Sequence, residues 1–300
     1  AGVSATNPQV RALSALTHDA TSDRVQVAWR QIYNGINRAN VSIDNIPKVQ
    51  GTEALKTRLI NEAKFIRALL YFQAVRLWGG VPIVLHEATS IQLGNLKTNR
   101  ATAEEVYTQI IKDLTDAESL PATYSAADAG RATSGAAKAI LAKVYLTRKD
   151  WPNAILKSRE VINGGYGYAL FEEFQDIFTK TKKNGKEHIF SAQFKGLTNW
   201  NGNMLASTAA PTSVPGIAGD QADALHKEGG LFEAFAETDK RKYITFAVEF
   251  VSPTDGKTYK VAPHFNKYFD PATPTSPGQS SKNTPIIRFA EVLLIYAEAL

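Results

Sequence analysis

The sequence predicts a mostly α-helical protein, built from antiparallel helical hairpins that carry long loops and a small β-hairpin region. Three observations lead to this fold class. Apolar residues recur at helical spacing in successive segments of 24–164 and again in 285–300. Pro or Gly residues end most of these segments. Between them, 165–284 contains polar stretches rich in Gly, Ser, Thr and Pro, together with short strand patterns.

The composition is that of an ordinary globular protein. The 300 residues are 44% hydrophobic and 21% charged, with a net charge of 34 − 29 = +5. There is no cysteine, which excludes disulfides, thiolate metal sites and cysteine nucleophiles. The densest basic run, 180–186, has no interleaved aromatic residues, so we expect no nucleic-acid partner. Charged residues interrupt the most apolar segment, so we expect no membrane-spanning helix.

Two long helices are expected first. The segment from about 24 to 46 has one apolar stripe, with Asp23 as a possible N-cap and Pro47 as its end. The next helix begins near 52–55 and runs into NEAKFIRALLYFQAVRLWGG. It carries two apolar faces, one of which is predicted to follow Leu55, Leu59, Ala63, Ile66, Leu70, Ala74 and Leu77. A helix with two apolar faces needs protein on both sides.

Three shorter helices follow. The pattern Thr102-Ala103-Glu104-Glu105 predicts a capping box at the start of a helix that ends near Ser119. Helices over 134–149 and 152–163 then form a pair containing ILAKVYLTRKDWPNAI, which matches the spacing of a tetratricopeptide (TPR) hairpin. Small residues at Ala142 and Ala154 allow close helix approach, and we expect Tyr145 and Trp151 to fill the groove between them.

The second half changes character. The segment 187–194 predicts a strand, and 244–251 with 257–261 predicts a β-hairpin around Asp255-Gly256. Polar loops are expected over 196–219 and 270–284, and 286–300 again predicts a helix.

Two segments together resemble the SusD/RagB family. The first is NEAKFIRALLYF through RLWGGVP at 61–82, and the second is PIIRFAEVLLIYAEA at 285–299. The first helix also fits the usual W…Y…I…N pattern of this family, through Trp29, Tyr33, Ile36 and Asn40. The order of the three segments agrees with the family, and the TPR-like pair lies between them.

The resemblance implies a single SusD-like domain over 1–300, which we expect to be truncated at its C-terminal end. Its TPR-like scaffold would span about 24–164 and 285–300, and a ligand-facing loop and β insertion would span about 165–284. The resemblance also implies a surface-exposed lipoprotein of the outer membrane in Bacteroidetes-type bacteria. Such a protein binds glycans, or in some cases peptides, above a SusC-like TonB-dependent transporter. The membrane attachment would be an N-terminal lipid anchor, whose cysteine is absent from this chain.

Catalysis is not indicated by any motif. The five histidines are scattered singly, and no HExxH, G-x-S-x-G or Walker A pattern occurs. Adjacent carboxylates such as Glu104-Glu105 lie at expected helix starts, where the helix dipole stabilises them. We therefore predict that the protein is not an enzyme and holds neither a cofactor nor a metal.

Glycan binding needs aromatic platforms for the C–H faces of sugar rings beside amide or charged groups for the hydroxyls. Trp200 lies in a polar loop with amides on both sides, so the candidate substrate-binding residues are Trp200, Asn199, Asn201 and Asn203. Tyr166 and Tyr168, in GGYGY, are weaker candidates. Structural alternatives remain open, because Trp200 could fold onto its own loop and the tyrosines could cover a helix end.

The favoured function is therefore non-catalytic glycan capture and delivery to the transporter. Two alternatives stay open: a peptide-binding member of the same family, and a TPR-like protein-interaction scaffold without a small ligand.

Overall fold

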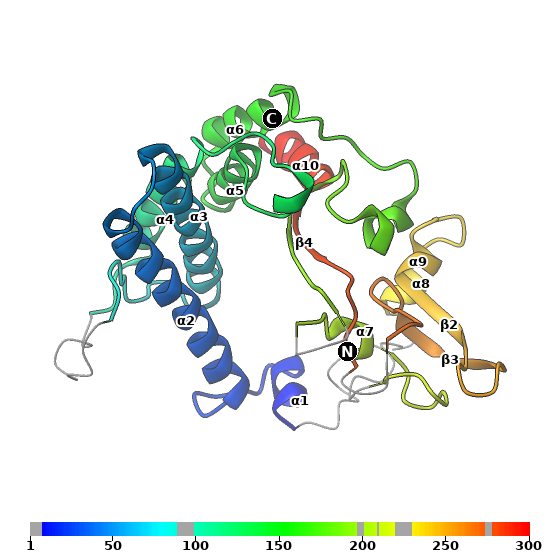
Figure 1. The fold of residues 1–300 in the computed structure, drawn as a ribbon. Coiled ribbons are helices and arrows are strands. Elements are labelled where there is room, and N and C mark those ends of the chain that lie inside the picture. The colour runs from blue at the N-terminus through cyan, green and yellow to red at the C-terminus, as the bar shows by residue number, and fades with distance from the viewer. Residues whose placement is uncertain (1–7, 89–98, 197–200, 209, 220–229, 274–277) are drawn as a thin grey trace. The chain divides into compact units, whose positions relative to one another are not determined.

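The computed structural model describes residues 8–88, 99–196, 201–208, 210–219, 230–273 and 278–300. It divides into two compact units: a helical unit of 25–169 with 287–300, and a loop-rich unit of 1–24 with 170–286 (Figure 1). The sequence placed the corresponding parts at 24–164 with 285–300 and at 165–284. The assignment of 1–24 to the loop-rich unit had no sequence signal. That the whole chain forms one domain stays a prediction.

The helical unit confirms the mostly α fold class. Its helices are α2 (Asp23–Asn45), α3 (Glu53–Trp78), α4 (Ala103–Ala117), α5 (Ser134–Thr147), α6 (Trp151–Asn163) and α10 (Phe289–Ala299). Neighbours in the chain pack as antiparallel pairs, α3 on α4 and α5 on α6, and α10 packs against both α5 and α6. Figure 1 shows these helices stacked beside one another, and the connection from α5 to α6 is a short turn.

The predicted helix starts are confirmed at atomic detail. The hydroxyl of Thr52 accepts a hydrogen bond from the amide of Leu55 at the start of α3. At α4 the capping box is complete, because the Thr102 hydroxyl accepts from the Glu105 amide and the Glu105 carboxylate accepts from the Thr102 amide. Each cap satisfies backbone donors that the first helical turn leaves open.

The apolar stripe predicted on α3 is wrong in part. Leu55, Ile66 and Leu77 are 41%, 38% and 64% exposed. The buried side of the helix is made of Asn61, Phe65, Arg67, Ala68, Tyr71, Phe72, Ala74 and Val75. A helix rich in apolar residues all round does not reveal from its own spacing which side its partners cover.

Residues of the signature segments hold the extended chain from Val81 to His86 against α2 and α3. Tyr33 donates a hydrogen bond to the carbonyl of Pro82 at 2.7 Å. The Asn40 amide donates to the carbonyls of Val84 and His86, at 2.9 and 3.2 Å. The Tyr71 hydroxyl lies 2.7 Å from the amide and 3.0 Å from the carbonyl of Val84. The polar residues of the signature therefore satisfy backbone groups of a segment that also pairs with the chain before α4 at the Pro82–Arg100 bridge.

Glycine is required at both Gly79 and Gly80 after α3, for a different reason at each position. Gly79 is the C-cap with φ of 69°, a conformation that favours glycine, and its amide donates to the carbonyl of Val75. Gly80 lies against the chain that enters α4, since a Cβ atom there would fall 2.1 Å from the carbonyl oxygen of Ala101. Two glycines are therefore required in sequence, one for a turn and one for close approach.

The α5–α6 pair packs through small residues as predicted. Ala142 and Ala154 are fully buried, in one cluster with Ile295 and Ala299 of α10. Trp151 corrects the sequence interpretation, because this first residue of α6 is 39% exposed and does not fill the groove.

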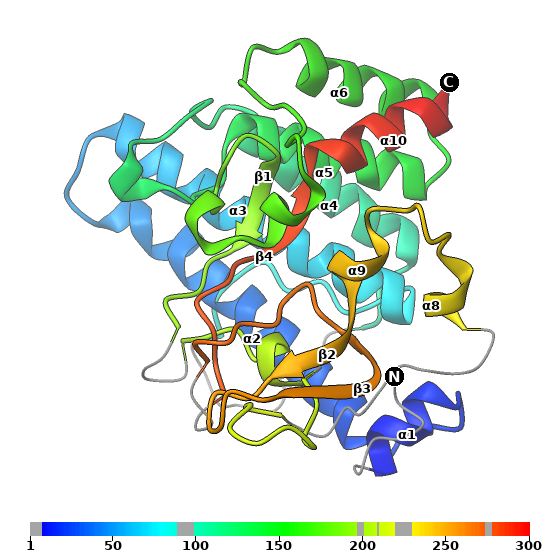
Figure 2. The same cartoon turned by 90° about the vertical axis from the view of Figure 1, so that its right-hand side faces the viewer.

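The helices and strands in the described residues of the loop-rich unit are short. They are α1 (Pro8–Ser14), β1 (His188–Ala192), α7 (Leu205–Thr208), α8 (Leu231–Ala234), α9 (Lys242–Thr245), β2 (Phe246–Val251) and β3 (Thr258–Phe265), with β4 (Thr284–Arg288) leading into α10. The predicted hairpin is confirmed, and β2 lies antiparallel to β3 in Figure 2. The expected final helix starts later than predicted, because 284–288 is a strand that pairs with β1.

Among the described residues, none of the helices combines the length and the apolar composition that a membrane crossing requires.

Candidate functional site

The predicted binding loop is anchored at its two ends. The amide of Lys195 donates to the carbonyl of Asn201 at 3.1 Å, and the amide of Gly196 lies 3.5 Å from the same oxygen. Asn199 and Trp200 lie between these ends and outside the described residues. Their part in binding stays a prediction, but the positions where the loop leaves and rejoins the unit are defined.

An open hollow of about 470 Å³ lies at the base of this loop. It is lined by Gln193, Phe194, Lys195 and Asn201, three of which are exposed while Phe194 is half-buried. A hollow of this size has room for one or two sugar rings. Its lining offers an aromatic face beside two amides and one ammonium group, which is the combination that hydroxyl-rich ligands require.

An amide network fixes the floor of the hollow. The side chains of Gln193 and Asn184 exchange two hydrogen bonds, at 2.9 and 3.0 Å. The Gln193 oxygen also accepts from the Asn283 amide at 2.7 Å, and Asn283 in turn accepts from the backbone amide of Phe194. The Gln193 amide also donates to the carbonyl of Ser191 at 2.9 Å, so its hydrogen-bonding groups are all occupied and it holds the floor of the hollow in place.

Lys183 also fixes the backbone that lines the hollow. Its ammonium donates to the carbonyl of Phe194 at 3.0 Å. Burial lowers the pKa of Lys183, and the positive charge of Lys180 lowers it further. The backbone on the aromatic side of the hollow is thus fixed by a partly desolvated cation.

Asn203 has a structural position. It is 2% exposed, and its side-chain amide donates to the carbonyl of Lys282 and to the hydroxyl of Thr284. Its side-chain oxygen accepts from the amide of Leu205, while its backbone pairs with Ser280. Asn203 therefore joins two long loops, and we leave it out of the ligand contacts proposed below.

Tyr166 and Tyr168 lie in the helical unit, where they pack against the start of α5. Their rings stack with centroids 5.6 Å apart, and the Tyr168 hydroxyl lies 3.2 Å from the hydroxyl of Thr133. A Cβ atom at Gly135 would approach the Tyr168 hydroxyl to 2.7 Å. Burial raises the pKa of Tyr168. The pair covers a helix end, which is the structural alternative that the sequence left open.

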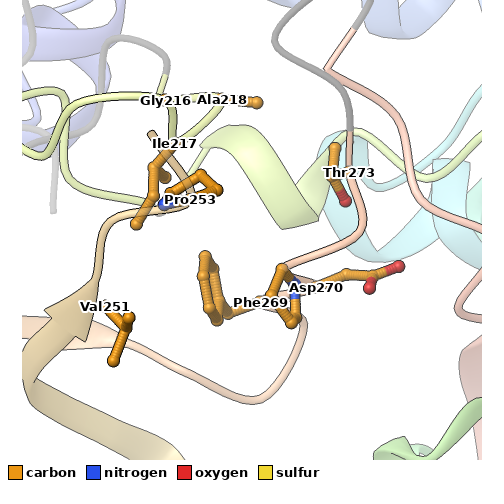
Figure 3. Close-up of a pocket in the computed structure, with 9 residues that line it drawn as sticks. Gly216, Ile217, Ala218, Val251, Pro253, Phe269, Asp270 and Thr273 are labelled. Carbon is orange, nitrogen blue, oxygen red and sulfur yellow. The ribbon is translucent and has the colours of Figure 1, made fainter. Parts of the chain in front are cut away.

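A smaller cavity, in the loop-rich unit, is shown in Figure 3. It lies between the residues after β2 and the loop of Phe269 and Asp270, and its volume is about 30 Å³. This is room for about one water molecule. The cavity is therefore too small for a sugar ring. The carboxylate of Asp270 in its lining is held by Lys180 at 3.0 Å and by the hydroxyl of Ser280.

A second groove, of about 300 Å³, had no sequence signal. It lies at the N-terminal end of β2, and its lining includes Gln175, Phe178, Tyr243, Asn266, Lys267 and Lys282. Four chain segments contribute to it, at 175–179, 243–244, 266–269 and 282, so no local pattern could have identified it.

The buried carboxylates among the described residues have structural partners. These carboxylates are Asp113, Glu187 and Asp270. Asp113 pairs with Arg67, and Glu187 accepts a hydrogen bond from the backbone amide of Phe171. No group of three or more His, Asp or Glu side chains suited to a metal ion occurs within the described part of the chain.

The fold and these sites define a class: a TPR-like helical scaffold joined to a loop-rich unit that carries polar hollows. The chain belongs to the SusD-like family. A model described as "Starch-binding associating with outer membrane" matches residues 2–146, and the SusD family model matches residues 252–300.

Relatives of known name cover nearly the whole chain. A SusD-like protein of Bacteroides ovatus is 30% identical over 93% of this chain and 56% of its own length. SusD-like protein P2 of Formosa agariphila is 31% identical over 92% of this chain and 58% of its own. The chain thus spans little more than half the length of these relatives.

Solved structures agree in fold. A SusD superfamily protein from Parabacteroides distasonis has a TM-score of 0.85 and 27% identity, covering 99% of this chain and 67% of its own. A laminarin-binding SusD-like protein has a TM-score of 0.86 and 26% identity, covering 99% and 71%. A structure named as a complex with a xylogluco-oligosaccharide has a TM-score of 0.82 and 26% identity, covering 99% and 65%.

Proposed function

We propose that this protein binds glycans at the bacterial cell surface without cleaving them and delivers them to a SusC-like TonB-dependent transporter. The observation that carries the proposal is the open hollow at the base of the 195–201 loop, with Phe194 and Asn201 in its lining. The relatives named for laminarin and for a xylogluco-oligosaccharide support a saccharide as the ligand.

Capture requires only stacking and hydrogen bonding. The ring of Phe194 would take the C–H face of a sugar, with Trp200 as the second aromatic candidate, while Asn201 exchanges hydrogen bonds with its hydroxyls. One or two stacked rings bury little area, so the affinity of a single site is expected to be modest. Weak capture suits a protein that must release its ligand to a transporter.

The proposal predicts that Trp200→Ala weakens oligosaccharide binding on the order of tenfold or more, because tryptophan side chains dominate binding energy where they are desolvated. The melting temperature is expected to fall by no more than about two degrees, because the proposed role of Trp200 is ligand contact and not core packing. Asn201→Ala should weaken binding by a smaller factor, since it removes one amide. Calorimetry with laminarin and xyloglucan oligosaccharides measures both.

The matched control is Trp151→Ala, which removes a 39% exposed tryptophan from the helical unit and should leave affinity unchanged. Unchanged affinity in Trp200→Ala, or a large loss of stability, contradicts the assigned site. A protein that binds extended peptides and no glycan would be a peptide-binding member of the family. A protein that binds neither would be an interaction scaffold.

Delivery and anchoring are tested separately. The full-length protein is expected to carry a lipid anchor and to co-purify from outer membranes with a SusC-like transporter. Product release from a polysaccharide panel would contradict the non-catalytic mechanism. Recovery of the protein without any TonB-dependent transporter would contradict delivery and leave glycan binding as a separate result.

A further inference from the structure

Two polar side chains in the described lining of the hollow at the 195–201 loop are not already taken up by the protein. The amide of Gln193 uses both of its hydrogens and its oxygen on other protein groups. The side chains of Lys195 and Asn201 are exposed, and neither has a hydrogen bond or an ion pair to another described residue. A ligand in the hollow therefore meets one neutral amide and one positive charge.

The backbone that carries Lys195 is fixed on both sides. Its own amide donates to the carbonyl of Asn201 at 3.1 Å. The next residue, Gly196, has a φ of 74° and lies against Ser281, since a Cβ atom there would fall 2.6 Å from the Ser281 amide nitrogen. The lysine side chain therefore starts from a defined point of the lining.

A second ammonium group, that of Lys183, lies behind the lining. The other three lysines of the basic run 180–186 have carboxylate partners: Lys180–Asp270, Lys182–Asp176 and Lys186–Glu172, at 3.0, 2.9 and 2.8 Å. Among the described residues Lys183 has no such partner, and it donates instead to the carbonyl of Phe194 at 3.0 Å. Its charge is therefore not neutralised by an ion pair.

The charge of the hollow is positive for two reasons that add to each other. Lys195 is the single charged residue in the segment 195–201, so this segment supplies no carboxylate to oppose it. Lys183 is partly desolvated, and burial lowers its pKa, which the positive charge of Lys180 lowers further. A partly buried charge is screened less than a solvated one. An anion in the hollow would gain from both ammonium groups, whereas a neutral sugar would gain hydrogen bonds alone.

We propose that this hollow prefers glycans that carry an anionic substituent, either a carboxylate or a sulfate ester on the sugar ring. Lys195 would contact the anion, Phe194 would take the face of the ring, and Lys183 would add its charge from behind the lining. The inference rests on the proposed function, because it names the class of glycan that the same hollow takes.

The test uses matched pairs of probes, titrated into the protein by calorimetry. Oligogalacturonate is compared with its methyl ester, and a sulfated galactan oligosaccharide with its desulfated form. We expect the charged member of at least one pair to bind about fivefold tighter at low salt, and the difference to shrink at high ionic strength. The pair that shows the difference identifies carboxylate or sulfate as the recognised group.

Substitutions then assign the preference to a residue. Lys195→Gln should bring the ratio of the charged and neutral affinities close to one, and Lys195→Arg should keep the preference, since it retains the charge. Lys257→Gln is the matched control. It removes the same charge from another exposed lysine of the loop-rich unit, in the turn between β2 and β3 and outside the described lining of the hollow. It should leave the ratio unchanged.

Equal affinity for the charged and neutral members of both pairs overturns the inference. A preference that Lys195→Gln leaves unaltered, or that Lys257→Gln also abolishes, overturns it as well. In each of these cases binding of the neutral glycans leaves the proposed function standing. If no saccharide of either kind binds, the proposed function fails and the inference fails with it.

Discussion

Asp113→Ala is expected to lower the free energy of unfolding by about 3–5 kcal/mol, because it leaves the buried guanidinium of Arg67 without its counter-ion. The two side chains are 1% and 5% exposed, and Arg67 donates to both carboxylate oxygens at 2.8 Å. Arg67 also donates to the side-chain oxygen of Asn40 and to the carbonyl of Leu85. One ion pair therefore joins α2, α3, α4 and the segment after α3. Urea unfolding followed by far-ultraviolet circular dichroism measures the loss.

A neighbouring pair between the same two helices supplies the control. Lys64 and Asp116 lie 2.7 Å apart, but their side chains are 24% and 38% exposed. Asp116→Ala should therefore cost less than about 1 kcal/mol. The double variant Arg67→Met with Asp113→Leu should recover most of the stability lost in Asp113→Ala, because no buried charge remains. Similar losses from Asp113→Ala and Asp116→Ala would contradict the role of burial.

Gly80→Ala is expected to destabilise the helical unit by about 3 kcal/mol or more, since the new methyl group meets backbone that cannot move alone. The nearest atoms are the oxygen of Ala101 at 2.1 Å, its carbonyl carbon at 3.2 Å and the amide nitrogen of Ala103 at 3.3 Å. The entry into α4 would have to shift away from the end of α3. The melting temperature of the variant measures the effect.

Gly51→Ala is the matched substitution at an open position, where the nearest atom to a Cβ is a methyl carbon of Leu55 at 4.0 Å. It should change stability by no more than about 0.5 kcal/mol. A loss at Gly80 as small as that at Gly51 would show that the close approach to Ala101 relaxes at little cost.

Local sequence accounts for most of the helical unit. The caps at Thr52 and Thr102, the small residues at Ala142 and Ala154 and the Gly79 turn all act over a few residues, so spacing reveals them. Arg67 and Arg76 both have structural partners, since Arg67 pairs with Asp113 and Arg76 donates to the carbonyl of Phe72. The family signatures also identified residues whose contacts are distant in the chain, such as Tyr33 and Asn40, which bond the backbone at Pro82 and Val84.

Long-range pairing accounts for the rest. The exposed Leu77 and Trp151 were expected in the core, because apolar character alone does not specify which side a neighbour covers. Asn203 and Ser280 pair across two loops separated by more than seventy residues, so the sequence contains no local signal for the structural contacts of Asn203.

The helices, their ends and the family can thus be predicted from the sequence, because helix formation and capping depend on neighbours within a turn or two. The hollow at Asn201 and the groove at Lys267 and Lys282 could not be predicted from it. The groove gathers side chains from four separate segments between 175 and 282, and the floor of the hollow is held by Asn283, ninety residues after Gln193. Such partnerships exist only after the loops have packed together.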